Sequence, residues 1–302
     1  GAGFTRDGVV YSYLPRLHVW SLSPSSGPSS GGTFVTFVGS ALDTYGELNC
    51  KFASSILPAT VTSESLVMCQ TPSQAAGPVA AEVIQDADES ASGLTFEFVP
   101  KAYVVGLEPS FGQVEGGTPV RVIGTGFGAG AACRFGERMA LSMYLSSTAV
   151  ACSSPAYVQG RISVEVTSNG QDFTDGGVPY DYVVAPSLSS LDPSRGPGVG
   201  GGIVTVVGEG FFQARSILCR FGSHGASPGR YISQNQVSCV TPASPPANVS
   251  FALTFNGVDW FDSPQRFAFD SYLYVNSLRP SFGTVTGNTL VTVAGSFSPG
   301  RY

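Results

Sequence analysis

Apolar and polar residues alternate along most of this chain, in short runs bounded by glycine or proline. The run Val35-Thr36-Phe37-Val38 and the run Val204-Thr205-Val206-Val207 are typical. Side chains of a strand point to opposite faces in turn, so this period of two predicts strands with one buried face. No stretch has a convincing helical period of 3.6 residues. Because short strands with turn residues between them are typical of a β-sandwich, the pattern predicts an all-β chain.

The strand pattern repeats about every 85 residues. Each repeat opens with Pro-x-x-Gly, a glycine-rich turn and an alternating strand. The opening prolines, which are 85, 84 and 87 positions apart, are Pro24, Pro109, Pro193 and Pro280. A fixed period of this length indicates tandem copies of one small unit rather than a single large domain.

A pair of cysteines follows the opening strand in each of three repeats. The first lies in Cys-x-Phe and the second in Val-x-Cys, which ends in a proline turn. The cysteines, separated by 19, 19 and 20 positions, are Cys50 and Cys69, Cys133 and Cys152, and Cys219 and Cys239. Alternation directs the Cys and Phe of Cys-x-Phe toward the core and the Lys or Arg between them toward water. The pattern therefore predicts a sulfur pair inside each unit.

Each unit closes with a hairpin and an aromatic strand. Asn169-Gly170 and Asn256-Gly257 predict two-residue type I′ turns, in which both central residues have positive φ. The closing strands lie at 94–98, 178–182 and 267–269.

These landmarks divide the chain into five segments. We expect residues 1–14 to be the closing strand of a preceding repeat, because residues 4–13 align with residues 173–182 without gaps. Three complete repeats follow at 15–100, 101–185 and 186–273, and residues 274–302 are the opening strands of a fourth. Either the chain is a window on a longer array, which we favour, or a closing strand of one chain docks on the next chain by strand addition. Strand exchange alone would leave the middle strands of that repeat missing and its edges exposed.

The ordered motifs Pro-x-x-Gly, Gly-Gly-Thr, Cys-x-Phe-Gly, Val-x-Cys-x-Thr-Pro and Asn-Gly resemble the immunoglobulin-like domain shared by plexins and transcription factors (IPT/TIG). The resemblance covers nearly the whole chain and implies tandem E-set-type sandwiches in a rod. Such domains serve as rods, spacers or docking surfaces of cell-surface receptors and secreted proteins, or as dimerising domains of transcription factors. The first repeat departs from the pattern at Ser40-Ala41-Leu42, at Ala53 and in lacking Asn-Gly.

Charge and cysteine content select among these roles. Only 12% of the residues are charged, the net charge is -6 and the pI is about 4.9, so we expect no nucleic-acid partner. A weakly charged surface needs cover from sugars or neighbouring subunits to stay soluble. Three cysteine pairs suit disulfides in an oxidising compartment, which predicts an extracellular or cell-surface protein. No apolar run approaches 18 residues, so we expect no membrane insertion of this segment.

The sequence offers no catalytic constellation. The two histidines, His18 and His224, fall at different points of the repeat and have no evident partner. The cysteine spacing differs from a zinc knuckle, and we expect no metal and no cofactor. The glycines of 124–130 look faintly like a phosphate loop, but no helix follows, so a turn is favoured. The acidic run Asp86-Ala87-Asp88-Glu89 is a lesser candidate for calcium.

Two surface residues are candidate modification and contact sites. Asn248-Val249-Ser250 is an N-glycosylation sequon, and serine and proline cluster at 23–30 and 241–246, a composition typical of either tight turns or glycosylated segments. Trp260 follows an Asn-Gly turn, where it either contacts a neighbouring domain, partner or sugar, or packs on its own domain.

Repeats joined by short proline-containing linkers predict a stiff rod. We expect a structural, non-catalytic building unit of an extracellular filament or surface appendage, with other copies of itself, further repeats and possibly glycans as partners. The alternative is the stalk or ligand-binding ectodomain of a cell-surface receptor or adhesin. A third possibility is an accessory region of a secreted carbohydrate-active enzyme.

Overall fold

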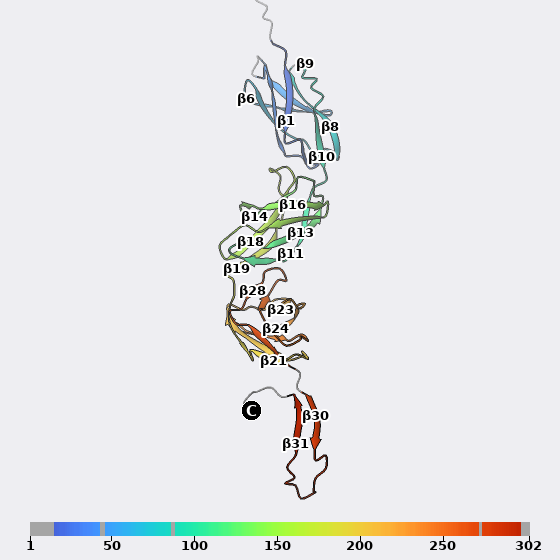
Figure 1. Cartoon of the computed structure of the whole chain (residues 1–302). Helices are drawn as coiled ribbons and strands as arrows, with labels where there is room; N and C mark the ends of the chain where they lie inside the picture. Colours follow the sequence, from blue (N-terminus) through green and yellow to red (C-terminus); the bar gives the residue numbers. More distant parts are fainter. Residues whose placement is uncertain (1–14, 43–45, 86–87, 272–273, 297–302) are drawn as a thin grey trace, which may run out of the picture. The chain divides into compact units, whose positions relative to one another are not determined.

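The computed structural model describes residues 15–42, 46–85, 88–271 and 274–296. These residues form strands and turns, and they contain no helix, hence none that is long and apolar enough to cross a membrane (Figure 1). The all-β architecture and its immunoglobulin-like sandwiches are therefore as predicted. The expected strand at residues 1–14 lies outside the described residues.

The first repeat is a sandwich of two sheets. One sheet has the strand order β1-β3-β7-β6, and the other has the order β2-β10-β8-β4-β5, with β9 paired to β8. Pairing is antiparallel except between β2 and β10, which run parallel. The strands are β1 (His18–Ser23), β2 (Ser26–Pro28), β3 (Phe34–Ser40), β4 (Leu48–Phe52), β5 (Ser55–Pro58), β6 (Thr60–Ser63), β7 (Leu66–Gln70), β8 (Gly77–Gln85), β9 (Asp88–Glu89) and β10 (Thr95–Val99).

The second repeat has the same topology, with the sheets β11-β13-β17-β16 and β12-β19-β18-β14-β15. The parallel pair is again the short opening strand with the closing strand. The strands are β11 (Tyr103–Glu108), β12 (Phe111–Gln113), β13 (Pro119–Thr125), β14 (Ala132–Phe135), β15 (Arg138–Met139), β16 (Leu141–Ser146), β17 (Ala149–Ser153), β18 (Gly160–Thr167) and β19 (Val178–Val183).

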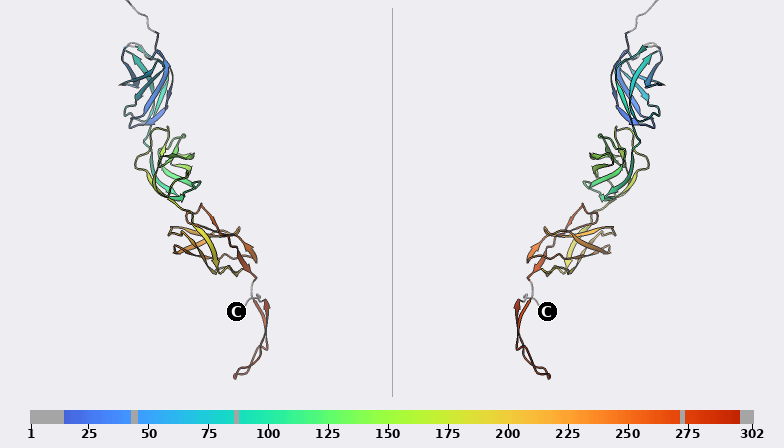
Figure 2. Two further views of the ribbon diagram at one scale, coloured as in Figure 1. Left: turned by 90° about the vertical axis from the view of Figure 1, so that its left-hand side faces the viewer. Right: turned by 90° about the vertical axis from the view of Figure 1, so that its right-hand side faces the viewer.

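The third repeat differs because one strand serves both sheets. Its β24 pairs with β23 and with β25, which joins seven strands in the order β20-β22-β25-β24-β23-β27-β28, and β21-β29-β26 form the other sheet. The strands are β20 (Ser187–Asp192), β21 (Arg195–Pro197), β22 (Ile203–Glu209), β23 (Ile217–Phe221), β24 (Ser227–Ser233), β25 (Gln236–Val240), β26 (Ala247–Val249), β27 (Phe251–Thr254), β28 (Phe261–Asp262) and β29 (Phe267–Asp270). After it, β30 (Tyr274–Arg279) and β31 (Thr292–Ser296) pair antiparallel. Figure 2 shows the ribbons of each repeat from two further sides.

By its internal contacts the chain divides into two compact units. The first comprises Gly1–Glu108, Arg121–Cys152 and Ser163–Pro179, and the second comprises Pro109–Val120, Ser153–Ile162 and Tyr180–Tyr302. The first unit thus contains the hairpin turn of the second repeat, and the second unit contains the opening strand β12 of that repeat. Both segments matter for the site described below.

An aromatic cluster and a disulfide fill the core of each sandwich. In the first repeat Phe52 is fully buried, and its ring contacts those of Phe96 and Phe98 edge-on, with centroids 5.7 and 6.4 Å apart. Edge-to-face contacts at this distance suit the ring quadrupoles. In the third repeat Phe221 takes the same place against Phe267, with centroids 5.2 Å apart.

The departures of the first repeat are accommodated without a change of fold. Leu42 is fully buried at the position of Phe127 and Phe211 in the other repeats. Ala53 has φ of 52°, close to the 58° of Gly136, so the turn after β4 keeps its left-handed residue although an alanine occupies it.

The prediction of type I′ turns at the two Asn-Gly pairs was wrong. Left-handed φ values of 77° and 83° belong to Gly170 and Gly257, whereas neither asparagine has positive φ. Instead Asn169 bends the loop with its side chain, since its Oδ1 accepts hydrogen bonds from the backbone N of Gln171 (3.0 Å) and Asp172 (2.9 Å). Asparagine favours turns for this reason as well as for its tolerance of positive φ.

Candidate functional site

A network of side-chain hydrogen bonds is built on the Asn169 turn, inside the first unit. The Oγ1 of Thr167, at the end of β18, accepts a hydrogen bond from the backbone N of Gly170 (2.9 Å). The turn brings the Asn169 amide against the carboxylate of Asp172, with 2.6 Å between Nδ2 and Oδ2. The sequence thus shapes a loop that presents an amide donor and a carboxylate acceptor side by side.

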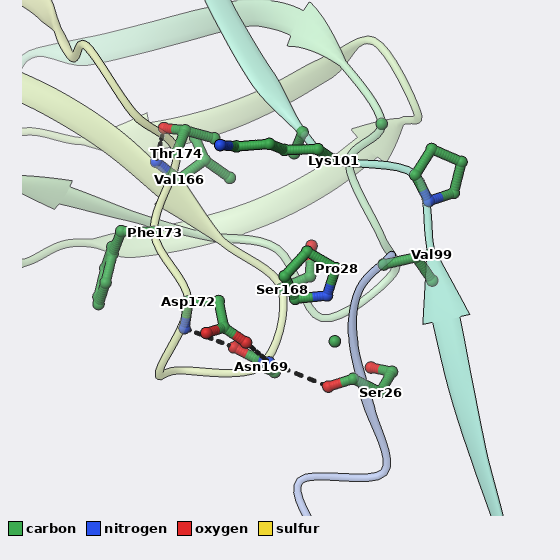
Figure 3. A pocket seen from close by; sticks show the side chains of 14 residues that line it. Ser26, Pro28, Val99, Lys101, Val166, Ser168, Asn169, Asp172, Phe173 and Thr174 are labelled. Atoms are coloured by element: carbon green, nitrogen blue, oxygen red, sulfur yellow. Dashed lines mark hydrogen bonds between the residues drawn. The ribbon is translucent and has the colours of Figure 1, made fainter. Parts of the chain in front are cut away.

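Both groups of this loop bind residues of the first repeat. Asn169 Nδ2 donates to the carbonyl oxygen of Ser26 (2.9 Å), as Figure 3 shows, and Thr33 Oγ1 donates to Asp172 Oδ2 (2.7 Å). Gln171 adds two hydrogen bonds to the backbone of Phe34, accepting at 2.8 Å from its N and donating at 3.3 Å to its O. We call Asn169, Asp172 and Thr33 the first clasp.

The same arrangement recurs in the second unit. Asn256 Nδ2 donates to Phe111 O (3.2 Å) and to Asp259 Oδ2 (2.8 Å), while Thr118 Oγ1 donates to Asp259 Oδ2 (2.8 Å). We call Asn256, Asp259 and Thr118 the second clasp. Since each clasp joins a hairpin turn to the opening segment of the preceding repeat, it links residues about 140 positions apart in the sequence.

The glycine of the Pro-x-x-Gly motif is explained by its closeness to the clasp threonine. A Cβ on Gly112 would lie 2.3 Å from Thr118 Oγ1 and 2.1 Å from Tyr180 Oη, and one on Gly27 would lie 2.2 Å from Thr33 Oγ1. No side chain fits at such distances. The glycine of the motif is therefore required for the threonine hydroxyl to occupy its position. This threonine is fully buried in both repeats.

Tyr180 adds a titratable group beside the second clasp. Burial raises the pKa of its phenol above the ordinary value, and hydrogen bonds involving Ser154 and Thr118 oppose that rise. The nearby Asp259 carboxylate raises the pKa further, because two negative charges repel. The first repeat has Phe96 at this position, so only the second clasp has an ionisable neighbour of this kind.

The third repeat departs from the clasp pattern. Gly202 stands where the other opening segments have Thr33, Thr118 and Thr289. Its backbone N still donates to Thr241 Oγ1 (3.0 Å), as the N of Thr33 does to Thr71 Oγ1 (3.1 Å). The local turn is thus retained and the hydroxyl donor is missing.

In each repeat the basic residue between Cys and Phe of the Cys-x-Phe motif contacts a side chain near the hairpin. Arg134 lies 3.6 Å from the ring centroid of Phe173, and Arg220 lies 4.2 Å from that of Trp260. In the first repeat Lys51 pairs with Glu89 instead, at 2.5 Å. The three cations lie on the outer side of their strands, as the alternation predicts, and each also contacts a side chain of its own repeat. Trp260 is half-buried in this contact, as expected if it packs on its own domain.

The six cysteines form three disulfides, and no cysteine among the described residues is free. The bonds join Cys50 to Cys69, Cys133 to Cys152, and Cys219 to Cys239, with Cα atoms 6.2, 6.3 and 6.0 Å apart. Every sulfur belongs to a buried residue of its own repeat. Asn248 lies exposed on β26, and Ser250 of its sequon is exposed as well.

The remaining candidates are not brought together into a site. The His18 ring lies 6.0 Å from that of Trp20, and the His224 ring lies 5.9 Å from that of Phe269, in different repeats. No group of three or more His, Cys, Asp or Glu residues within the described ranges is arranged to hold a metal ion. Asp86 of the acidic run lies outside the described residues, and a turn containing the buried Phe127 follows β13.

Sequence reasoning missed the clasps. Their signal was present, because an aspartate follows each Asn-Gly by two positions and a threonine follows each Gly-Gly of the first two repeats. A pattern within one repeat does not reveal the contact, because the threonine and the aspartate that bind each other belong to successive repeats.

Comparison with known proteins identifies the repeats. The family model described as IPT/TIG domain matches residues 17–98, 102–182 and 186–269. Human Fibrocystin-L is 23% identical over 97% of this chain and 7% of its own length, and human Plexin-A2 is 32% identical over 40% of this chain and 6% of its own length. A solved structure of the full extracellular region of Plexin A4 matches 87% of this chain and 25% of that chain, with 16% identity and a TM-score of 0.47. The chain spans less than a tenth of the length of these curated relatives.

Proposed function

The chain belongs to the IPT/TIG domain family, and from that premise we propose that it is a segment of the extracellular stalk of a cell-surface receptor. In this stalk each clasp holds a repeat to the one before it. The chain acts by spacing and presenting other parts of its protein, and not by catalysis.

The observation that carries the proposal is the recurrence of one clasp in both units. A chance surface contact would not reproduce the same amide, carboxylate and hydroxyl at equivalent positions of two repeats, with lengths between 2.6 and 3.2 Å. Hydrogen bonds to a carboxylate are roughly twice as strong as neutral ones, which suits a contact that must bear load. A stalk needs such ordered contacts between successive repeats.

The location agrees with this role. The protein is extracellular or at the cell surface, since three buried disulfides form and persist in an oxidising compartment and the related proteins include plexins and fibrocystin-L. The same relatives favour a receptor stalk over the filament subunit expected from the sequence, because they match this chain as a small part of a much longer protein.

The test is made on the native polypeptide in its own cells. Intact cells are labelled with a membrane-impermeant biotin reagent, and the labelled polypeptide is sized and sequenced by mass spectrometry. We expect a labelled chain several times longer than 302 residues that stays with the membrane fraction after a high-salt wash. Recovery of the chain as ordered filaments in electron micrographs of the medium would overturn the proposal.

A further inference from the structure

Small residues surround the first clasp where aromatic residues surround the second. Four pairs of equivalent positions differ in this way, which the repeat alignment and the shared hydrogen bonds of the two turns establish. The pairs are Ser26 and Phe111, Gly128 and Phe212, Ser168 and Phe255, and Thr174 and Phe261. In each pair the residue near the first clasp lacks the aromatic ring that its counterpart near the second clasp carries.

In the second unit the four rings pack on one another. Phe212 stacks on Phe255 with centroids 4.7 Å apart and planes at 25°, and it meets Phe111 edge-on at 5.3 Å. Phe261 lies 6.5 Å from Phe255. The space left beside this cluster is about 180 Å³. A ring supplied by the chain itself therefore occupies the second position.

In the first unit the equivalent place is a hollow that is open to solvent, with about 460 Å³ of free space including its solvent-filled mouth (Figure 3). Pro28, Val99 and Pro100 give it an apolar wall, while Ser26 and Ser168 contribute hydroxyl groups. Figure 3 shows Pro28 and Ser168 among the lining residues beside the Asn169 turn, with the Lys101 side chain extending toward Thr174. Lys101 is paired with Asp175, and both side chains remain accessible at 37% and 73%.

We propose that this hollow is a binding site for a tyrosine side chain presented by a partner protein. The second unit shows which chemistry this place accepts, since the ring of Phe212 lies there against the rings of Phe111 and Phe255. Aromatic side chains bury about 150–250 Å² each in cores and interfaces, and they dominate the energetics of such contacts. The hydroxyls of Ser26 and Ser168 and the ammonium of Lys101 suit a ring with a polar tip, which distinguishes tyrosine from phenylalanine.

This site adds partner binding to the spacing role, and it does not depend on the chain being part of a receptor. One ring held in this open hollow would act as an anchor within a larger interface. A sugar ring is the main competing occupant, because it too has an apolar face and hydroxyl groups.

The probe is N-acetyl-L-tyrosinamide, titrated into the ¹⁵N-labelled chain and followed by amide chemical shifts. We expect saturable shifts confined to the residues lining the hollow, with a dissociation constant on the order of 1 mM. N-acetyl-L-alaninamide and methyl β-glucoside serve as the probes without an aromatic ring. Equal shifts with the glucoside, or no saturable shifts with the tyrosine derivative, would overturn the proposal.

Two variants fill the hollow from opposite repeats. Gly128→Phe supplies the ring found at Phe212, and Ser26→Phe supplies the ring found at Phe111. Each should weaken binding of the probe at least tenfold. A Cβ at Gly128 would lie 3.2 Å from Ser168 Oγ, so a small shift of that serine is needed, and Ser26→Phe gives the same test if the first variant does not fold.

Leu141→Phe, at a position that is 84% exposed on β16, is the matched control and should bind normally. Unchanged binding in a folded Gly128→Phe or Ser26→Phe protein would also reject the site.

Discussion

Thr118 Oγ1 donates a hydrogen bond of 2.8 Å to Oδ2 of Asp259, a residue 141 positions further along the chain. The equivalent bond from Thr33 to Asp172 is 2.7 Å long and spans 139 positions. A carboxylate buried in part and bound to a hydroxyl that is wholly buried has few alternative partners. The pair therefore links the opening segment of one repeat to the hairpin turn of the next.

Replacing Thr118 by valine should loosen the second clasp and leave the first intact. The change keeps the shape of the side chain and removes its donor to a carboxylate, an interaction that contributes about 1.5–3 kcal/mol. We expect hydrogen–deuterium exchange of the amides of residues 256–259 to become faster by about tenfold or more, because 1.4 kcal/mol corresponds to a factor of ten. The exchange is measured residue by residue by NMR.

The matched control for this variant is Thr60→Val, at an exposed position of β6. It should leave exchange at 256–259 unchanged. Asp259→Asn, alone and combined with Thr118→Val, completes a double-mutant cycle in which a coupling near zero would contradict the assigned hydrogen bond.

We expect the protein to lose stability at alkaline pH because the phenol of Tyr180 is buried. Since burial raises the pKa of its phenol, the native state holds the proton more tightly than the unfolded state does. The resulting stability is fully present below the unfolded pKa of about 10 and is lost as pH rises from there through the folded pKa. Urea unfolding should therefore show a steeper fall in stability between about pH 9.5 and pH 11 for the native sequence than for Tyr180→Phe.

The phenylalanine variant keeps the ring, as Phe96 and Phe267 do at the same position of the other repeats. Tyr103→Phe, at a half-exposed position on β11, should follow the native pH profile. Identical alkaline profiles for the native chain and Tyr180→Phe would show that the phenol is not the group responsible.

Much of the fold was predictable because each repeat carries its own signals. The alternation of buried and exposed residues along β3 follows directly from Val35, Phe37 and their neighbours, and the core positions of Cys50 and Phe52 follow from their spacing of two. These features depend on local geometry, which a strand imposes wherever it occurs. The three copies of each motif made the inference stronger than any single copy would allow.

The clasp and the shape of its turn could not be predicted from the sequence in the same way. Asn169-Gly170 favours a type I′ turn on its own, but the Thr167 hydroxyl and the Asn169 side chain impose a different loop through bonds that local preference does not reveal. The contact with Ser26 joins two repeats, so no pattern inside one repeat specifies it. The presence of Gly128 at the position equivalent to Phe212 also predicts a hollow only when the structures of the two units are compared.

Removal of one disulfide should destabilise its own repeat. Cys133→Ala combined with Cys152→Ala opens a loop of about 20 residues, for which the chain-entropy model gives about 3 kcal/mol. We expect a calorimetric transition of the variant to shift to lower temperature. The pair Cys219→Ala and Cys239→Ala should act alike because its loop has nearly the same length. An unchanged melting profile in either variant would contradict a stabilising role for that bond.

Asn248 should carry an N-linked glycan when the chain is made in a eukaryotic secretory pathway. Its side chain is exposed on β26, at the edge of the sheet β21-β29-β26, where an attached sugar would shield backbone groups that could pair with another chain. We expect peptide N-glycosidase F to reduce the mass of the secreted protein, and both Asn248→Gln and Ser250→Ala to abolish that reduction. Asn276→Gln, at an exposed asparagine outside any sequon, should leave it unchanged. Because 12% of the residues are charged, the unglycosylated variants should also self-associate more readily in sedimentation experiments. Enzyme treatment without a change in mass would show that exposure of this sequon is not sufficient for its modification.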